Sequence, residues 1–357
     1  MKIVRIILFI LNVILALGLL MTTVAGYVSP TKSIYPSLMA FGYPMLLGAN
    51  VLVAVLWLLF GRWEFLLSVG VIAVRYAFVP LFIQVGGTSQ IPSADEHPQM
   101  VSLMNYNVHL FQGNDPVTVT PADSNAREFL ALVREYNPDV LCMQEYEKVK
   151  KVSVTDSLVL MGYSHFYSSS GDAVRNPRGE VVFSKLPITF VKRIDGTKVL
   201  VELLKDESAF RLLCVHLDSY RFDNNDRAEI EKMRHGEVEE SSRRTFSKVK
   251  ETILEHEQEW NTLLKPLVTE CSLPLVMAGD MNDIPSSYLY HQISKELSDC
   301  YTDKGVGFST TYNGGFPRYR IDMVFHSEGI STLSYKRVRT GISDHYPLIV
   351  SFELEAQ

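Results

Sequence analysis

The sequence predicts an α/β domain preceded by three transmembrane helices, and three observations support this. Three long apolar stretches occupy the first quarter of the 357 residues, and each is near the ~20 residues that cross a bilayer as a helix. Beyond residue 100, apolar runs with the two-residue period of strands recur, and one segment has the longer period of a helix. We therefore predict a transmembrane region at 1–86, a linker at 87–99 and a catalytic domain at 100–357.

The apolar stretches are Ile6–Tyr27, Pro36–Phe60 and Trp63–Ile83. A cleaved signal peptide explains the first stretch but leaves the other two unexplained, so we expect an integral membrane protein. Lys2 and Arg5 precede the first stretch, and basic loop residues favour the cytoplasmic side. An inside N-terminus followed by three crossings places the catalytic domain outside the cytoplasm.

Charge is distributed unevenly between these parts. The chain has 34 Lys and Arg and 40 Asp and Glu residues, of which five and one fall in the first 90 positions, so the remainder carries a net charge of −10. Binding of duplex DNA rests on many basic contacts to phosphates, and this excess of acid argues against it. The four Cys residues lack metal-ligand spacing, and we expect free thiols, with a disulfide as the alternative outside the cell.

The elements of the catalytic domain follow from periodicity and turns. Residues 86–99 contain Gly, Thr, Ser and Pro residues that break every period, as in a linker. Residues 126–133 place apolar side chains at helical spacing, and this helix ends before Pro138. Short runs within 180–217 predict a mostly antiparallel sheet. The charged segment 224–270 predicts helices that cover a sheet or, alternatively, a lid or membrane-facing element.

Several predicted strands end on a carboxylate, an amide or an imidazole. Alternation along an extended strand sends such side chains to one side, so each strand begins in a core and finishes at a polar rim. That arrangement is typical of active sites in α/β proteins. The segments that show it are Val101–His109, Val140–Glu145, Leu212–Asp218, Leu275–Asn282 and the cluster Ser343–His345.

Three of these segments carry residue types that hydrolysis of a phosphate ester requires, namely a metal ligand, a base and donors to the phosphoryl oxygens. Glu145 is a lone carboxylate after a buried strand and suits Mg²⁺, which prefers oxygen ligands; the alternative is a capping or salt-bridging acid. Asp280 and Asn282 are two residues apart, so the acid can take a proton from water while the amide donates to phosphate. The alternative there is an Asx-rich turn.

The cluster that opens the last strand places an acid beside an imidazole. The imidazolium of His345 can stabilise a charged phosphoryl group, and a carboxylate such as Asp322 can hold its ring and tautomer. Taken alone, His345 would be an ordinary surface histidine.

Taken in order, these motifs resemble the endonuclease/exonuclease/phosphatase superfamily from about Met100 to Phe352. The matching segments are Tyr106–Val108, Gln144–Glu145, Gly179–Ile188, Val215–Ser219, Gly279–Asn282, Arg320–Asp322 and Ser343–His345. Each motif is weak alone, but their order along one domain is specific. The resemblance implies a DNase I-like, four-layer α/β sandwich.

The resemblance also implies a divalent metal, Mg²⁺ or alternatively Mn²⁺. It is held chiefly by Glu145, with Asn107 and Asp344 close by. Two departures stand out. Met281 replaces the aromatic residue usual between the Asp and the Asn, which we expect to be a packing change. His109 stands where some nucleases carry an acid, which casts doubt on a second metal site.

The resemblance further implies the catalytic roles. Asp280 orients or deprotonates the attacking water, Asn282 and His216 contact the phosphate, and Asp322 supports His345.

The resemblance to this superfamily indicates the type of bond more closely than it indicates the substrate. A basic rim around the cleft is expected from Arg175, Arg178, Arg318 and Arg320, which suits a phosphorylated head group. We predict a membrane-anchored, metal-dependent phosphoesterase acting on a phosphodiester or phosphomonoester, with a lipid head group or nucleic acid as substrate and the bilayer as partner. We predict no protein partner. The alternatives are an extracytoplasmic nuclease and a non-catalytic binding protein of the same fold.

Overall fold

The computed structural model describes residues 2–78, 82–93, 95–113, 121–170, 177–220, 242–314 and 318–355. The chain divides into two compact units. The helical unit comprises Met1–Leu81, Asp218–Lys265 and Asp283–Ile293, and the sandwich unit comprises Phe82–Leu217, Pro266–Asn282 and Ser294–Gln357. The domain boundaries expected at 86 and 100 stay a prediction, because two later segments also belong to the helical unit.

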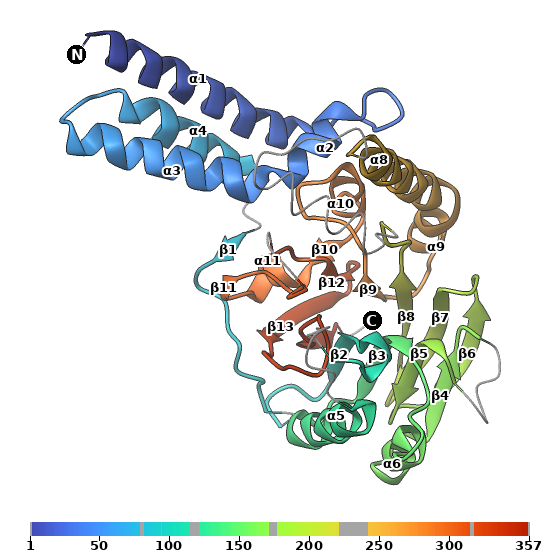
Figure 1. Cartoon of the computed structure of the whole chain (residues 1–357). Coiled ribbons are helices and arrows are strands. Elements are labelled where there is room, and N and C mark those ends of the chain that lie inside the picture. The colour runs from blue at the N-terminus through green and yellow to red at the C-terminus, as the bar shows by residue number, and fades with distance from the viewer. Residues whose placement is uncertain are drawn as a thin grey trace. The chain divides into compact units, whose positions relative to one another are not determined.

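The helical unit contains the apolar N-terminal helices and two later ones (Figure 1). Its helices are α1 (Lys2–Val24), α2 (Tyr35–Phe41), α3 (Tyr43–Leu59), α4 (Phe65–Phe78), α8 (Ser242–Glu259), a π-helical segment (Trp260–Leu264) and α10 (Tyr288–Ile293). The part of the charged segment at 224–241 lies outside the described residues. Inside the N-terminal bundle, Ser68 Oγ donates to Asn12 Oδ1 at 2.6 Å, and Arg75 Nε donates to Thr22 Oγ1 at 3.2 Å.

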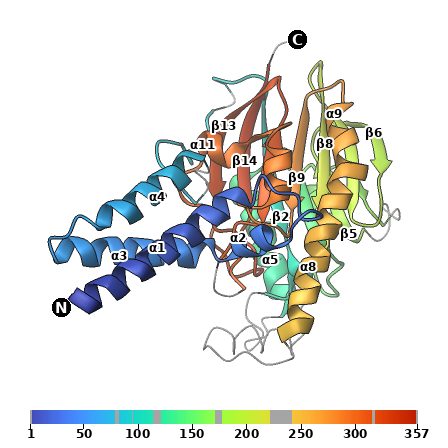
Figure 2. The same cartoon turned by 90° about the horizontal axis from the view of Figure 1, so that it is seen from above.

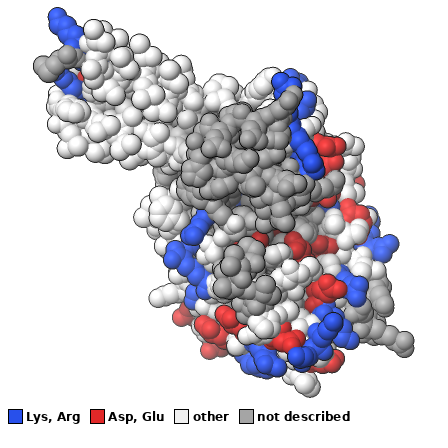
Figure 3. All heavy atoms as spheres, in the orientation of Figure 1, with Lys and Arg blue, Asp and Glu red and all other residues white. Residues whose placement is uncertain are grey.

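Of the three predicted transmembrane helices, only one corresponds to a single described helix that is long and apolar enough to cross a membrane. By length and composition, α1 can cross a membrane, with a mean hydropathy of 2.8. The second predicted span is broken into α2 and α3, which are bent by 66°, because Pro44 near the start of α3 cannot continue a preceding helix. The third is the shorter apolar helix Phe65–Tyr76 within the described residues. Figure 3 shows that this part of the surface is almost uncharged except at one end.

The sandwich unit is built from two six-stranded sheets (Figures 1 and 2). The first sheet has the order β13-β14-β2-β3-β5-β4, and the second has the order β10-β12-β9-β8-β7-β6. The strands of the first sheet are β2 (Met100–Asn107), β3 (Val140–Tyr146), β4 (His165–Ser168), β5 (Gly179–Ser184), β13 (Ile330–Arg337) and β14 (Leu348–Leu354). Those of the second are β6 (Ile188–Arg193), β7 (Lys198–Lys205), β8 (Ser208–His216), β9 (Leu275–Asp280), β10 (Ser298–Asp299) and β12 (Asp322–His326).

Each sheet contains one parallel pair among otherwise antiparallel described strands. These pairs are β2 with β3 and β8 with β9. Parallel neighbours end at the same edge of a sheet. The ends of β2 and β3 therefore lie side by side, as do the ends of β8 and β9. The antiparallel sheet expected for the middle of the domain is confirmed for β6, β7 and β8, whereas β5 belongs to the first sheet, where it pairs with β3 and β4.

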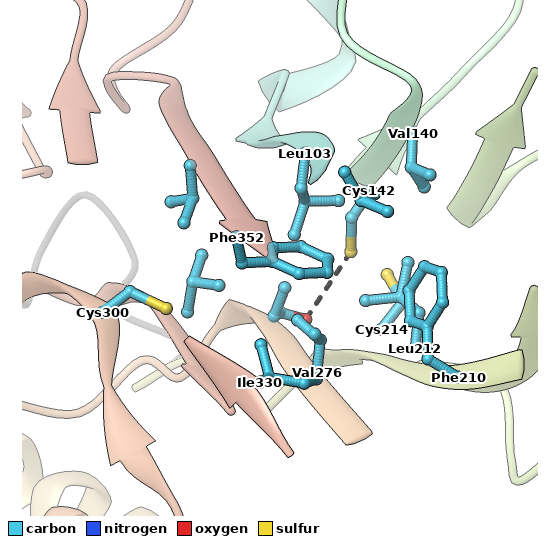
Figure 4. Packing of buried hydrophobic residues seen from close by; sticks show 14 of the residues in the cluster. Leu103, Val140, Cys142, Phe210, Leu212, Cys214, Val276, Cys300, Ile330 and Phe352 are labelled. Carbon is cyan, nitrogen blue, oxygen red and sulfur yellow. Dashed lines mark hydrogen bonds between the residues drawn. The ribbon is translucent and has the colours of Figure 1, made fainter. Parts of the chain in front are cut away.

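An apolar core lies between the two sheets (Figure 4). Leu103 and Cys142 from the first sheet meet Leu212, Cys214 and Val276 from the second, and all five are at most 1% exposed. Truncating such a residue to Ala costs about 2–5 kcal/mol. All four Cys residues are free thiols, as expected.

Helices cover the outer face of the first sheet. Residues Phe129 and Val133 of α5 (Ala122–Tyr136) and Leu158 of α6 (Val154–Leu160) pack on Leu141 and Phe183. The α/β sandwich with two sheets is thus confirmed. The fourth layer stays a prediction, because α8 and α10 belong to the helical unit.

The described residues of the expected linker belong to the sandwich unit, and smaller elements complete that unit. They are β1 (Ile83–Gln84), which pairs with β11 (Gly307–Phe308), α9 (Lys265–Thr269) at the unit boundary, α11 (Cys300–Lys304) and a single turn at His109–Phe111. In the linker, the amide of Thr88 donates to the carbonyl of Lys304 at 3.0 Å, and its carbonyl accepts from the amide of Tyr335 at 3.0 Å.

Candidate active site

The ends of the two parallel strand pairs carry four of the predicted site residues. Asn107 ends β2, Glu145 is near the end of β3, His216 ends β8 and Asp280 ends β9. His216 and Asp280 are partners in the β8–β9 register. The parallel pairing of β2 with β3 and of β8 with β9 therefore brings together side chains that are far apart in sequence.

Asn107 joins the two sheets at this point. Its Nδ2 donates to Glu145 Oε1 at 3.1 Å and to Asp280 Oδ2 at 3.0 Å. Its Oδ1 accepts from the amide of His109 at 3.0 Å. Asn107 is fully buried, so its bonds fix the distance between two carboxylates that would otherwise repel.

Glu145 reaches the site through an irregularity in β3. The register with β5 shifts between Met143 and Tyr146, and Glu145 has a φ of 52°. A left-handed residue in a bulge turns its strand and re-aims a side chain, at a cost of order 1–3 kcal/mol for a non-Gly residue. The Glu145 side chain is 32% exposed, so it stands at the open side of the cluster.

Asp280 needs a close backbone approach beside it. A Cβ at the preceding Gly279 would lie 1.8 Å from the carbonyl oxygen of Val215, so only Gly allows β9 to pair with β8 there. Asp280 Oδ1 accepts from the amide of Asn282 at 2.8 Å, and Asn282 Nδ2 donates to the carbonyl of Leu217 at 2.9 Å. The Asp280–Asn282 turn is thus held on both sides.

His345 is held by a buried carboxylate. Its Nδ1 lies 2.8 Å from Asp322 Oδ2, and its Nε2 lies 3.7 Å from Asp280 Oδ2. Burial opposes a charge on this imidazole, but the carboxylates of Asp322 and Asp280 outweigh burial and raise the pKa of His345 to about 10. His345 is therefore an imidazolium at neutral pH. Asp322 faces Asp280 in the β12–β9 register, and Thr311 Oγ1 accepts from its amide at 3.0 Å.

His216 mirrors this arrangement with another carboxylate. Its Nδ1 lies 3.1 Å from Glu180 Oε1, and its Nε2 lies 3.8 Å from both Glu145 Oε1 and Asp280 Oδ2. Burial alone would lower the pKa of His216, but the bond to Glu180 and the charges of Asp280 and Glu145 raise it. Glu180 is 3% exposed, and its Oε2 accepts from Ser169 Oγ at 2.8 Å.

Asp280 is the carboxylate that both imidazoles face. It is 1% exposed. Burial raises its pKa, His345 and His216 lower it, and Asp322 raises it, with a net rise. A buried carboxylate with a raised pKa is a better proton acceptor than an ordinary Asp, so this position suits a general base.

Two family models match the sequence. Residues 104–345 match a family described as the Endonuclease/Exonuclease/phosphatase family, and residues 5–82 match a domain of unknown function, DUF8431. The first match spans well over half of the chain. The chain belongs to the Endonuclease/Exonuclease/phosphatase family. No curated protein matches.

Solved structures of Endonuclease/Exonuclease/phosphatase proteins are similar at low sequence identity. A protein of this family from Beutenbergia cavernae is 17% identical with a TM-score of 0.48 and covers 72% of each chain. One from Bacteroides vulgatus is 16% identical with a TM-score of 0.47 and covers 72% of this chain and 99% of its own. The human Nocturnin catalytic domain is 16% identical with a TM-score of 0.48 and covers 72% and 94%. The family assignment rests on the sequence match.

Asp344, which was expected near a metal, lies beside His345 and His109. Its Oδ1 is 3.2 Å from His109 Nδ1, 3.3 Å from Ser343 Oγ and 3.9 Å from His345 Nε2. The structure thus brings Asn107 and Glu145 into direct contact and places Asp344 beside His109. The role of Asp344 as a metal ligand stays a prediction.

A divalent metal fits the Glu145 side of the site. Glu145 and Asp280 offer carboxylate oxygens here, which are hard donors of the kind that Mg²⁺ takes. Asn107 turns its Nδ2 toward both of them and its Oδ1 toward the amide of His109, so its role as a metal ligand stays a prediction. Asp280, Asp322 and His345 also have possible ligand atoms within 4.8 Å of one another. We favour the first group, because it includes Glu145, which is 32% exposed and accessible to a hydrated cation, whereas Asp280, Asp322 and His345 are all buried.

Two features of the site differ from what the sequence suggested. Glu180 had no predicted role, although an acid at the start of an apolar strand needs a buried partner, and that signal could have found it. Arg320 was expected at a basic rim but is 2% exposed, and its two terminal nitrogens donate to both Asp299 oxygens at 3.0 and 2.6 Å. Arg178 is exposed, with Glu147 3.8 Å away, and Arg175 lies outside the described residues.

Proposed function

We propose that this chain is a membrane-anchored, Mg²⁺-dependent phosphoesterase that hydrolyses a phosphodiester or phosphomonoester by attack of water. One observation carries this proposal. The buried carboxylate of Asp280 faces two imidazoles at under 4 Å, and each imidazole is held by a second carboxylate. The same Asp280 oxygen shares the Asn107 amide with Glu145. This arrangement combines a base with two imidazoles beside the Glu145 carboxylate.

Asp280 takes the role of base. Its Oδ1 is occupied by the amide of Asn282, which fixes the carboxylate plane, so water is oriented at the remaining lone pairs. As the water oxygen bonds to phosphorus, its proton passes to the Asp280 carboxylate and the bond between phosphorus and the ester oxygen breaks. The leaving group departs as an alkoxide that takes a proton from solvent. The raised pKa of Asp280 favours this transfer near neutral pH.

His345 and His216 stabilise the charge that develops on the phosphoryl oxygens. Their Nε2 atoms lie on the Asp280 side of each ring, while the Nδ1 atoms are held by Asp322 and Glu180. Donors fixed before the reaction need no reorganisation in the transition state. Asn282 adds an amide group to the same set.

Glu145 and Asn107, with Asp344 as a further candidate, would hold the metal. Bound Mg²⁺, or Mn²⁺ as the alternative, would polarise the phosphoryl oxygen and offset its negative charge. The Glu145 side chain is 32% exposed, so it is accessible to a hydrated cation.

We also propose that α1 anchors the protein in a bilayer and that residues 100–357 form the catalytic domain outside the cytoplasm, joined through residues 87–99 to a transmembrane region at 1–86. This location favours a lipid head group as substrate. Protease treatment of intact cells tests the orientation, because cleavage of this domain only after lysis would contradict it.

The activity is tested on the full-length protein in detergent with an aryl phosphodiester and a phosphomonoester. We expect turnover with added Mg²⁺ and its loss on chelation by EDTA. Asp280→Asn serves as the inactive control. Absence of turnover on a broad panel of phosphate esters would favour a non-catalytic binding protein of this fold.

A nuclease is the second candidate, since the family's description includes endonucleases and exonucleases. Nicking of plasmid DNA and release of a phospholipid head group are measured side by side at equal enzyme concentration. Faster nicking would assign the protein to the nucleases.

A further inference from the structure

A buried histidine in the helical unit contacts the two chain segments that continue from the active site. His256 of α8 is 1% exposed. Its Nε2 lies 2.8 Å from the carbonyl oxygen of Asp218, so this nitrogen carries a proton and donates. Its Nδ1 lies 3.6 Å from Asp283 Oδ2, which is beyond a hydrogen bond but close enough for attraction. His256, Asp218 and Asp283 all belong to the helical unit.

The two partners of His256 are joined by peptide bonds to the two residues that form the hydrogen bond beside Asp280. Asp218 follows Leu217 in the chain, and Asp283 follows Asn282. Within the sandwich unit, Asn282 Nδ2 donates to the carbonyl of Leu217 at 2.9 Å. The two segments that His256 holds are therefore the same two that this hydrogen bond joins. One segment leads from His216, and the other leads from Asp280.

The neighbouring residue fixes α8 itself. Glu257 is 6% exposed, and its carboxylate accepts from Ser29 Oγ at 2.5 Å and from the amide of Thr31 at 3.0 Å. These two residues follow α1 in the chain. These hydrogen bonds tie α8 to the segment that follows α1. They therefore restrain the helix from which His256 contacts Asp218 and Asp283.

Packing alone does not account for an imidazole at this position. Ile253, three residues earlier in α8, is 5% exposed and shows that an apolar side chain satisfies the buried face. A buried polar group costs free energy unless it is hydrogen-bonded. The polar contacts of His256 with both segments therefore indicate a role beyond filling space.

We propose that His256 is a positioning residue for the phosphoesterase reaction, holding Asn282 and the end of β8 in the geometry that the transition state requires. This inference rests on the proposed function. It adds to the reaction a residue that lies outside the strand ends and acts through the peptide bonds at Asp218 and Asp283. Asn282 is the group through which the effect reaches the phosphate.

Kinetics of His256→Leu in the full-length protein test this. With an aryl phosphodiester and Mg²⁺, kcat should fall about 10-fold or more while KM changes by less than about 2-fold, because a displaced group loses transition-state contacts more than ground-state binding. His256→Gln keeps a donor toward Asp218 and should recover part of the loss. His326→Leu is the matched control. That histidine is also buried against a carboxylate, with Asp303 Oδ2 2.9 Å from its Nε2, and its loss should lower stability without changing kcat.

A double mutant separates this role from a general loss of stability. In an Asn282→Ala background, His256→Leu should lower kcat by less than about 2-fold, because the group it positions is already absent. An equal fall in both backgrounds would overturn the inference, as would an unchanged kcat in the single variant.

Hydrogen exchange gives a readout that does not depend on activity. His256→Leu should speed amide exchange in two peptides, around residues 217–219 and 281–284, relative to His326→Leu. Exchange that rises only within α8 would refute a positioning role. If the wild-type protein hydrolyses no phosphate ester, the proposed function fails, whereas this measurement still decides whether His256 holds the two segments.

Discussion

The two imidazoles of the site have the same connections but different surroundings. His345 and His216 each place Nδ1 on a carboxylate, at 2.8 and 3.1 Å, and each places Nε2 at 3.7 or 3.8 Å from the same oxygen of Asp280. The His345 side chain is 7% exposed, and the His216 side chain is 15% exposed. His345 adjoins Asp344, whereas His216 adjoins Glu145.

Because of this difference, His345 carries a constant charge, whereas His216 is more accessible to solvent. His345 is enclosed by carboxylates that hold its pKa near 10, so its charge is constant across the physiological range. His216 stands beside the partly exposed Glu145, where substrate and metal would enter. The variants below should therefore affect the His345 side more than the His216 side.

Asp280→Asn should have the largest effect, because it removes the group that both imidazoles share. We expect kcat to fall by about 10³-fold, within the range for loss of a general base. Thermal unfolding should occur at the same or a higher temperature, since burial of the Asp280 carboxylate already opposes its charge. A variant that retained the full rate would show that another group accepts the proton.

Asp322→Asn should follow, with a fall in kcat of about 10²-fold. An amide at this position does not carry the charge that keeps His345 protonated, and it can favour the wrong tautomer of the ring. Steady-state kinetics at pH 7 measure this effect. Asp303→Asn, which alters the partner of His326 elsewhere in the unit, controls for stability and should leave kcat unchanged.

Glu180→Gln should have a smaller effect, about 10-fold on kcat. His216 is closer to solvent than His345, and its ring also has the charge of Glu145 nearby, so the loss of one partner is partly offset. The ratio of the two variants' rates is the decisive quantity. Equal falls in kcat for Glu180→Gln and Asp322→Asn would mean that the two imidazoles contribute equally to catalysis.

The identity of the strand-end residues could be predicted from the sequence, whereas their contacts could not. Alternation along the strands placed Asn107 and Glu145 toward the ends of their strands, where both lie, although Asn107 is fully buried. That they touch depends on the parallel pairing of β2 with β3 and on the bulge at Glu145. Both depend on long-range packing, which a local period does not encode.

Burial was the other quantity that the sequence did not reveal. Arg320 was counted as a surface charge because Arg is usually exposed, yet Asp299, 21 residues earlier, pairs with it in the interior. Glu180 was missed because the apolar residues around it made its strand appear to have only a structural role. In the N-terminal region, apolar composition predicted helices correctly but did not show the break between α2 and α3, which depends on one proline.

The last prediction concerns stability and its dependence on pH. The pKa of His345 is raised from 6.5 to about 10, so its contribution is fully present below pH 6.5 and is lost as the pH rises through about 10. The difference in free energy of unfolding between the wild type and His345→Gln should thus be largest at pH 6 and shrink toward pH 10. The change should be a few kcal/mol, at about 1.4 kcal/mol for each unit by which the pKa is raised. Urea denaturation at several pH values measures it, and His216→Gln should show a shallower dependence, because His216 lies closer to solvent. A difference that stayed constant from pH 6 to 10 would show that the carboxylates around His345 do not hold its charge, and the contrast between the two imidazoles would fail.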